Sequence, residues 1–79
     1  MVKGVQKVGR TTRIYRGLAF SYLPNAKRSL PVRLWLFVND ELQSRSFSNI
    51  SEAVIFIDSV LDNGGVVREN GNRLIAKGA

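Results

Sequence analysis

The chain has 79 residues, of which 44% are apolar, so it is long enough for one small globular domain and too apolar for a disordered one. It contains no Cys and no His, which excludes a disulfide framework and removes the commonest zinc ligand and the commonest general base. Twelve Lys and Arg residues against six Asp and Glu residues give a net charge of +6, which favours an acidic partner.

The composition of residues 1–31 predicts a flexible arm, then a strand, then a loop. Residues 1–10 hold few large apolar side chains and predict a flexible basic arm, so a single α+β domain is expected over residues 11–79. Residues 11–20 are rich in β-branched and aromatic side chains and predict one strand, with Gly17 as a bulge. Residues 21–31 contain both prolines and predict a turn or mobile loop. It is long for a hairpin connection, and long loops often carry function.

Two further strands are predicted in the middle of the chain. Residues 32–38 are almost wholly β-forming and give the clearest strand in the sequence. Asn39 and Asp40 are turn residues, so residues 41–47 are expected to return beside them as a third strand. Beyond the helix described next, Asn-Gly at positions 70 and 71 predicts a small C-terminal hairpin.

A helix is predicted from Ile50 to Asp62. Asn49 followed by Glu52 three residues later is a capping-box pattern, and apolar residues recur at helical spacing over a wide arc. Asp58 lies on the opposite arc with Asp62, where the two carboxylates are expected to form a solvated face; a cation site is the alternative. The predicted fold is therefore α+β, with a three-stranded antiparallel sheet packed by one helix and followed by a small C-terminal β-hairpin.

Strand alternation divides the predicted sheet into two sets of side chains. The set expected to face the helix is mostly apolar and comprises Ile14, Leu18, Phe20, Val32, Leu34, Leu36, Val38 and Leu42, with Arg16, Ser44 and Ser46. The opposite set interleaves three arginines with four aromatic residues and comprises Arg13, Tyr15, Arg33, Trp35, Phe37, Arg45 and Phe47.

The arginine and aromatic set carries the functional prediction. Guanidinium groups pair with phosphates and base edges, and aromatic rings stack on unpaired bases. Such a face can also be a second small core under the C-terminal hairpin, or a protein interface. Eight positive residues and no acidic residue precede Asp40, which favours nucleic acid, with DNA expected first. The residues predicted to bind it are Arg13, Tyr15, Arg16, Lys27, Arg28, Arg33, Trp35 and Arg45.

Other functions are less favoured by the sequence. The alternative is a non-catalytic protein-interaction module, either a homodimer or an adaptor for an acidic partner. Catalytic clusters, metal-ligand spacings and phosphate-binding glycine loops are absent from the sequence, so we expect no enzyme activity, no cofactor and no small-molecule substrate. Apolar runs fall short of the roughly 18 residues that span a membrane, and the first nine residues lack a signal-peptide core, so we expect a cytoplasmic protein without membrane contact.

Four short motifs carry a resemblance: Tyr15-Arg16-Gly17, Trp35 with Phe37, the run from Phe47 to Ala53, and Phe56-Ile57-Asp58. Their layout is similar to that of small phage and mobile-element proteins. The order of elements is similar, more distantly, to the three-stranded sheet and helix of phage-integrase arm-binding and AP2-like DNA-binding domains. That resemblance implies that exposed sheet residues enter the major groove, at the matching positions Arg13, Arg33, Trp35 and Arg45. The loop at residues 21–31 and the hairpin after the helix depart from the family pattern.

Overall fold

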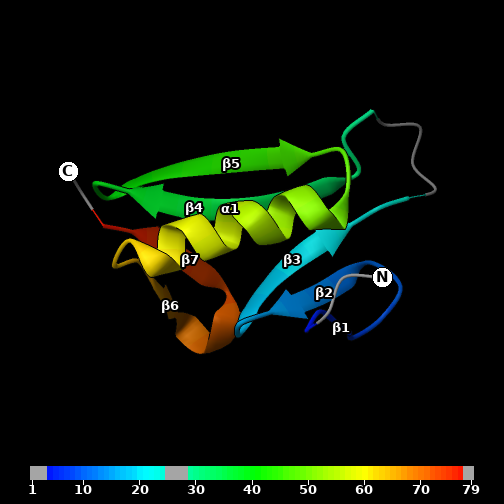
Figure 1. Cartoon of the computed structure of the whole chain (residues 1–79), viewed down its shortest axis with the longest axis horizontal. Helices are drawn as coiled ribbons and strands as arrows, with labels where there is room; N and C mark the ends of the chain where they lie inside the picture. Colours follow the sequence, from blue (N-terminus) through cyan, green and yellow to red (C-terminus); the bar gives the residue numbers. More distant parts are fainter. Residues whose placement is uncertain (1–3, 25–28, 78–79) are drawn as a thin grey trace.

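The computed structural model describes residues 4–24 and 29–77, and in them seven strands form one curled mixed sheet crossed by a single helix (Figure 1). The elements in chain order are β1 (Gln6–Lys7), β2 (Thr12–Tyr15), β3 (Leu18–Tyr22), β4 (Val32–Val38), β5 (Glu41–Phe47), α1 (Ile50–Asp62), β6 (Val66–Arg68), the 3-10 turn η1 (Glu69–Gly71) and β7 (Arg73–Ala76). The predicted three-stranded sheet with a separate hairpin is therefore wrong, because all seven strands belong to one sheet.

Strand β4 is the centre of the sheet and explains this difference. Along one edge, β5 pairs antiparallel with the whole length of β4. The other edge is shared, because β3 pairs with Val32 and Arg33 while β7 runs parallel beside Leu36, Phe37 and Val38. The C-terminal hairpin therefore extends the sheet past β4. A parallel partner placed after a helical crossover leaves no local signal in the sequence, which is why the hairpin was expected to stand apart.

Residues 11–20 form a tight hairpin rather than one strand with a bulge. The chain reverses at Arg16 and Gly17, whose φ angles of 51° and 83° are the positive values that a two-residue turn of the I′ type requires. Tyr15 consequently lies opposite Leu18. β1, which belongs to the segment predicted as a flexible arm, pairs antiparallel with β2.

The hydrophobic core lies between α1 and one face of the sheet. Its buried side chains come from β3, β4, α1 and β7 and are Leu18, Phe20, Val32, Leu34, Leu36, Ala53, Ile57 and Leu74. Each is at most 4% exposed, and burial of a Leu or Ile side chain contributes about 2 kcal/mol. The predicted bounds of the helix are confirmed, and its apolar arc packs on the sheet as expected.

Side chains of the preceding loop hold the start of α1. The Asn49 side chain accepts a hydrogen bond from the Glu52 N–H at 2.9 Å, which confirms Asn49 as the N-cap. The Glu52 carboxylate accepts hydrogen bonds from both the backbone N–H and the hydroxyl of Ser48. These bonds lower the pKa of Glu52 below its ordinary value of 4.5, and the bond from the Ser48 hydroxyl has the larger effect.

The lowered pKa of Glu52 predicts a loss of helix stability in acid. The stabilisation is complete above the unfolded-state pKa and disappears as the pH falls through the lower folded-state pKa. We expect the melting temperature of the natural chain to fall more steeply below about pH 4.5 than that of Glu52→Gln. Thermal unfolding followed by circular dichroism between pH 7 and pH 2 measures this, and parallel curves for the two chains would contradict it.

Candidate nucleic-acid interface

Strand β4 presents a buried face to the helix and an exposed face to the other side. Leu34 and Leu36 are almost fully buried under α1, whereas Arg33 and Trp35, which alternate with them, are exposed. The Trp35 side chain keeps 50% of its surface accessible. The alternation predicted for this strand is confirmed, and we use the name outer face for the sheet surface turned away from α1.

Strand β5 has the opposite alternation from the predicted one. Its turn contains only Asn39 and Asp40, with φ angles of 52° and 65°, so Leu34 of β4 lies opposite Arg45. Residues directly opposite in a pair of strands point to the same face, so Arg45 and Phe47 lie on the helix side. Leu42, Ser44 and Ser46, predicted to face the helix, lie on the outer face instead.

Contacts with the helix agree with this reversal. The rings of Phe47 and Phe56 are 5.4 Å apart, and the Arg45 guanidinium lies 5.5 Å from the centre of the Phe56 ring. The predicted placement of Arg45 and Phe47 beside Trp35 is therefore wrong. A two-residue turn pairs even-numbered with odd-numbered residues, which exchanges the faces between the two strands.

The hairpin of β2 and β3 moves two further predicted residues to the helix side. Arg13 lies opposite Phe20, and its guanidinium covers the Tyr22 ring at 4.9 Å. The Tyr15 hydroxyl donates a hydrogen bond of 2.8 Å to Oδ1 of Asp58 on α1. This bond is the main reason that the pKa of Tyr15 is raised above its ordinary value of 10.0. Neither residue belongs to the outer face.

Arg16, at the tip of that hairpin, is an ion-pair partner of the helix. Its Nη1 lies 3.1 Å from Oδ1 of Asp58 and 3.1 Å from Oδ1 of Asp62. The bond to Asp62, and then that to Asp58, raises the pKa of Arg16. The two carboxylates predicted as a solvated face therefore fasten the β2–β3 hairpin to α1, and they engage Arg16 on the helix side.

Strands β6 and β7 add residues to the outer face that the sequence did not indicate. Ile75 lies opposite Phe37, and the Arg73 guanidinium stands 4.7 Å above the Phe37 ring. Arg68 lies opposite Arg73, whose Nε is 3.0 Å from Oε2 of Glu69. Along the face, Arg33 and Trp35 are thus followed by an aromatic ring and two more arginines. The parallel pairing of β7 with β4 is what brings Arg68 and Arg73 to the same face as Arg33 and Trp35.

The strand pairing fixes the composition of the outer face. Its residues are Gln6, Thr12, Ile14, Ala19, Ser21, Arg33, Trp35, Phe37, Leu42, Ser44, Ser46, Val66, Arg68, Arg73 and Ile75. This set contains three arginines, and the carboxylate of Glu69, from the neighbouring turn η1, pairs with one of them, Arg73. Four acidic residues, Glu41, Glu52, Asp58 and Asp62, lie on strands or helix of the other side. The same side also carries four basic residues, Lys7, Arg13, Arg16 and Arg45, so its charges balance, and the outer face is the side with a net positive charge.

The structure also bears on the alternative that the arginine and aromatic face is a second core. β6 and β7 lie beside β4 in the sheet and leave Trp35 half exposed. They do not cover it. The predicted phosphate contacts Lys27 and Arg28 lie outside the described residues.

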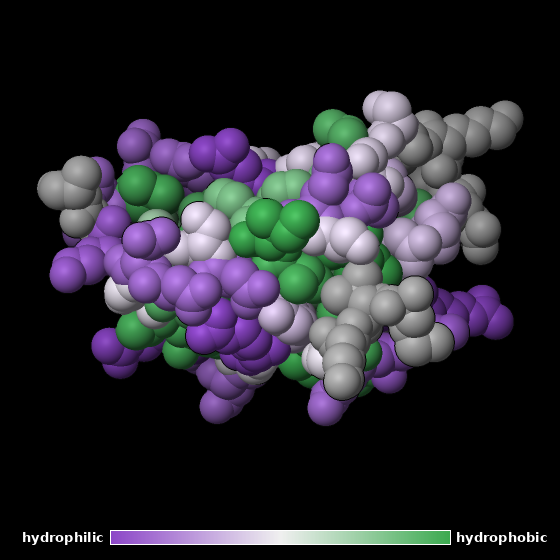
Figure 2. Space-filling view, viewed as in Figure 1, coloured by the Kyte–Doolittle hydropathy of each residue, from purple (hydrophilic) through white to green (hydrophobic). Residues whose placement is uncertain are grey.

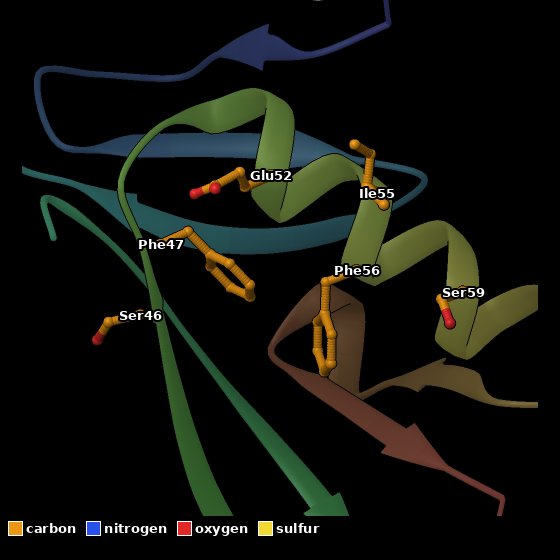
Figure 3. Close-up of a pocket in the computed structure, with 6 residues that line it drawn as sticks. All are labelled: Ser46, Phe47, Glu52, Ile55, Phe56 and Ser59. Atoms are coloured by element: carbon orange, nitrogen blue, oxygen red, sulfur yellow. The ribbon is translucent and has the colours of Figure 1, made fainter.

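The helix side is largely hydrophilic, with a hydrophobic area over the middle of α1 (Figure 2). A shallow groove of about 550 Å³ lies there, lined by Phe47, Glu52, Ile55, Phe56 and Ser59, and bordered at β5 by Ser46, whose side chain points away from the rings (Figure 3). Figure 3 shows the rings of Phe47 and Phe56 turned toward each other, with Ile55 standing away from them. Glu52 is engaged by the helix cap, so the groove is a hydrophobic surface rather than a set of reactive groups.

Across residues 4–24 and 29–77, no cluster of three His, Cys, Asp or Glu side chains is placed to hold a metal ion. No helix in the described part of the chain combines the length and the apolar character needed to cross a membrane. Comparison with protein-family models, curated proteins and solved structures finds no match to this chain. The resemblance to phage proteins and to integrase-like domains stays a prediction.

Proposed function

We propose that the protein is a non-catalytic domain that binds single-stranded nucleic acid on its outer face. The observation that carries the proposal is Trp35, whose ring is half exposed on a face with three arginines, one of which is paired with Glu69. An exposed aromatic ring stacks on an unpaired base with about 1–3 kcal/mol. We propose a cytoplasmic location, where such a ligand is found.

The surroundings of Trp35 leave room for a base. Its partner on β5 is Ser44, a small residue. On the other edge of β4, the pairing with β3 ends at Arg33 and the pairing with β7 begins at Leu36, so Trp35 stands at the fork between two strands. The first residue of β7 is Arg73, whose guanidinium lies on the Phe37 ring, and the Trp35 ring stays half exposed.

The arginines flank this aromatic surface, Arg33 along β4 and Arg73 and Arg68 across the sheet on β7 and β6. Arg33 precedes Trp35 by two residues, a step of about 7 Å along the strand. Phe37 follows at the same spacing, with Arg73 above its ring and Arg68 beyond. A nucleic-acid strand crossing this face would place a base on the Trp35 ring and phosphates near Arg33 on β4 or near the arginines of β7 and β6.

A single strand fits this arrangement better than a duplex. Insertion into a major groove, as the resemblance to integrase-like domains implies, requires Arg13, Arg33, Trp35 and Arg45 on one surface. Arg13 and Arg45 lie on the helix side, so these four residues do not share a face. What the outer face offers is a stacking surface, which only unpaired bases can reach.

The test uses the fluorescence of Trp35, which is the one tryptophan of the chain. A short oligothymidylate is expected to quench it at low salt, and a duplex of equal length should bind more weakly. With three arginines in contact, log affinity should fall with log salt with a slope of about −2. Arg33→Gln should reduce the magnitude of that slope by about 0.7, because one phosphate contact is lost.

The matched control for this titration is Lys7→Gln. Lys7 lies opposite Arg13 on the helix side, so the substitution removes the same charge from the other side of the sheet. The slope should remain that of the natural chain. Equal effects of both substitutions, or an absence of quenching at low salt, would refute binding on the outer face.

A further inference from the structure

Strand β5 has an open edge along its full length. It pairs with β4 on one side, and no strand of residues 4–24 or 29–77 pairs with its other side (Figure 1). With seven residues it is longer than the other two edge strands, β1 with two and β6 with three. Unpaired N–H and C=O groups make a long open edge a template for another strand, so proteins usually keep such edges short.

The turn before β5 decides which backbone groups are available at this edge. A two-residue turn makes its flanking residues, Val38 and Glu41, a hydrogen-bonded pair, and such pairs recur at every second residue. The N–H and C=O groups of Leu42, Ser44 and Ser46 consequently point toward the open edge. The edge contains no proline that would interrupt pairing.

We propose that two copies of the chain pair antiparallel through β5, about a two-fold axis at Gln43. In this register Glu41 of each copy lies directly opposite Arg45 of the other. Both side chains are exposed and lie on the helix side, since they oppose Val38 and Leu34 within one copy. Opposite charges across an antiparallel pair stabilise it, so β5 is complementary to itself in charge.

The outer face supports the same register. On this face the register places Leu42, which is 54% exposed, opposite Ser44 of the second copy. The two Leu42 side chains are then diagonal neighbours, about 7–8 Å apart. The row of side chains across four strands then reads Trp35, Ser44, Leu42 and Phe37, with the last two from the second copy. The register centred on Ser44 instead places Glu41 opposite Phe47, and both advantages are lost.

The dimer would contain one continuous sheet. The two-fold axis between antiparallel strands is perpendicular to the sheet, so both outer faces lie on the same side. Two Trp35 rings are then presented on one surface, and the charged helices lie on the other. The pairing uses only β5 and needs no ligand, so its failure would leave the binding proposed for Trp35 untouched.

Sedimentation equilibrium from micromolar to millimolar concentration tests the pairing. We expect the natural chain to approach twice its mass of 8.8 kDa. Glu41→Arg places like charges opposite each other in two pairs, as does Arg45→Glu, and each should weaken dimerisation about tenfold or more. An equimolar mixture of these two variants restores opposite charges in both pairs and should dimerise as the natural chain does.

The mixture separates the pairing from other effects of the substitutions. Arg45→Glu also removes the contact with Phe56, but a loss of fold could not be reversed by adding Glu41→Arg. Lys7→Glu is the matched control, because it makes the same change of charge away from β5 and should leave dimerisation unchanged. A monomeric natural chain, equal dimerisation of all variants, or a mixture that stays monomeric would overturn the proposal.

Discussion

Replacement of Trp35 by alanine is expected to weaken binding of a short single-stranded oligonucleotide about 10- to 100-fold, since stacking on an aromatic ring contributes about 1–3 kcal/mol per base. The arginines of the outer face remain in this variant, so residual binding should keep the salt dependence of the natural chain. The anisotropy of a labelled oligonucleotide measures the affinity without relying on the lost fluorophore. Trp35→Phe should retain most of the affinity, because a smaller ring still stacks.

The control for Trp35→Ala removes an exposed apolar side chain from the other side of the molecule. Ile55 on α1 is 68% exposed, and its replacement by alanine should change neither affinity nor fold. Because Trp35 is half exposed, we expect Trp35→Ala to cost only about 1 kcal/mol of stability, which amide NMR spectra and urea unfolding would verify. Unchanged affinity in Trp35→Ala, or equal losses in both variants, would contradict the stacking role.

The parts of the fold that were predicted correctly depend on local signals. The helix begins at Asn49 because that side chain caps it, and a capping residue with helical spacing can be read within one short segment. β4 was also recognised, because its alternation of buried leucines with Arg33 and Trp35 is contained in seven residues. These elements need no knowledge of their partners.

The errors arose at the turns and at one distant pairing. Asn39-Asp40 was identified as a turn, but its two-residue length also determines which residues of β5 share a face with Trp35. The β-branched and aromatic residues of 11–20 predict one strand through Gly17, and the turn escapes this pattern because it needs a positive φ at Arg16, which non-glycine residues seldom adopt. Arg68 and Arg73 reach the outer face only through the parallel pairing of β7 with β4, which joins segments more than 30 residues apart.

The largest loss of stability from a single small substitution is expected for Gly71→Ala. Gly71 is buried at the end of η1 with a φ of 94°, and a Cβ there would overlap the backbone carbonyl oxygen of Gly17. That contact joins the β2–β3 hairpin to the turn between β6 and β7. Because a backbone atom cannot move aside as a side chain does, we expect a loss of about 3 kcal/mol.

Gly17→Ala separates the overlap from the cost of positive φ. Gly17 has a similar φ of 83°, but a Cβ there would meet no atom within 4 Å. Its replacement should therefore cost only the conformational strain, about 1 kcal/mol, and urea unfolding of the two variants measures the difference. A domain of this size has roughly 4–10 kcal/mol of stability, so Gly71→Ala should unfold at far lower urea concentration. Equal midpoints would mean that the close approach of the two hairpins at this contact does not limit the stability of the fold.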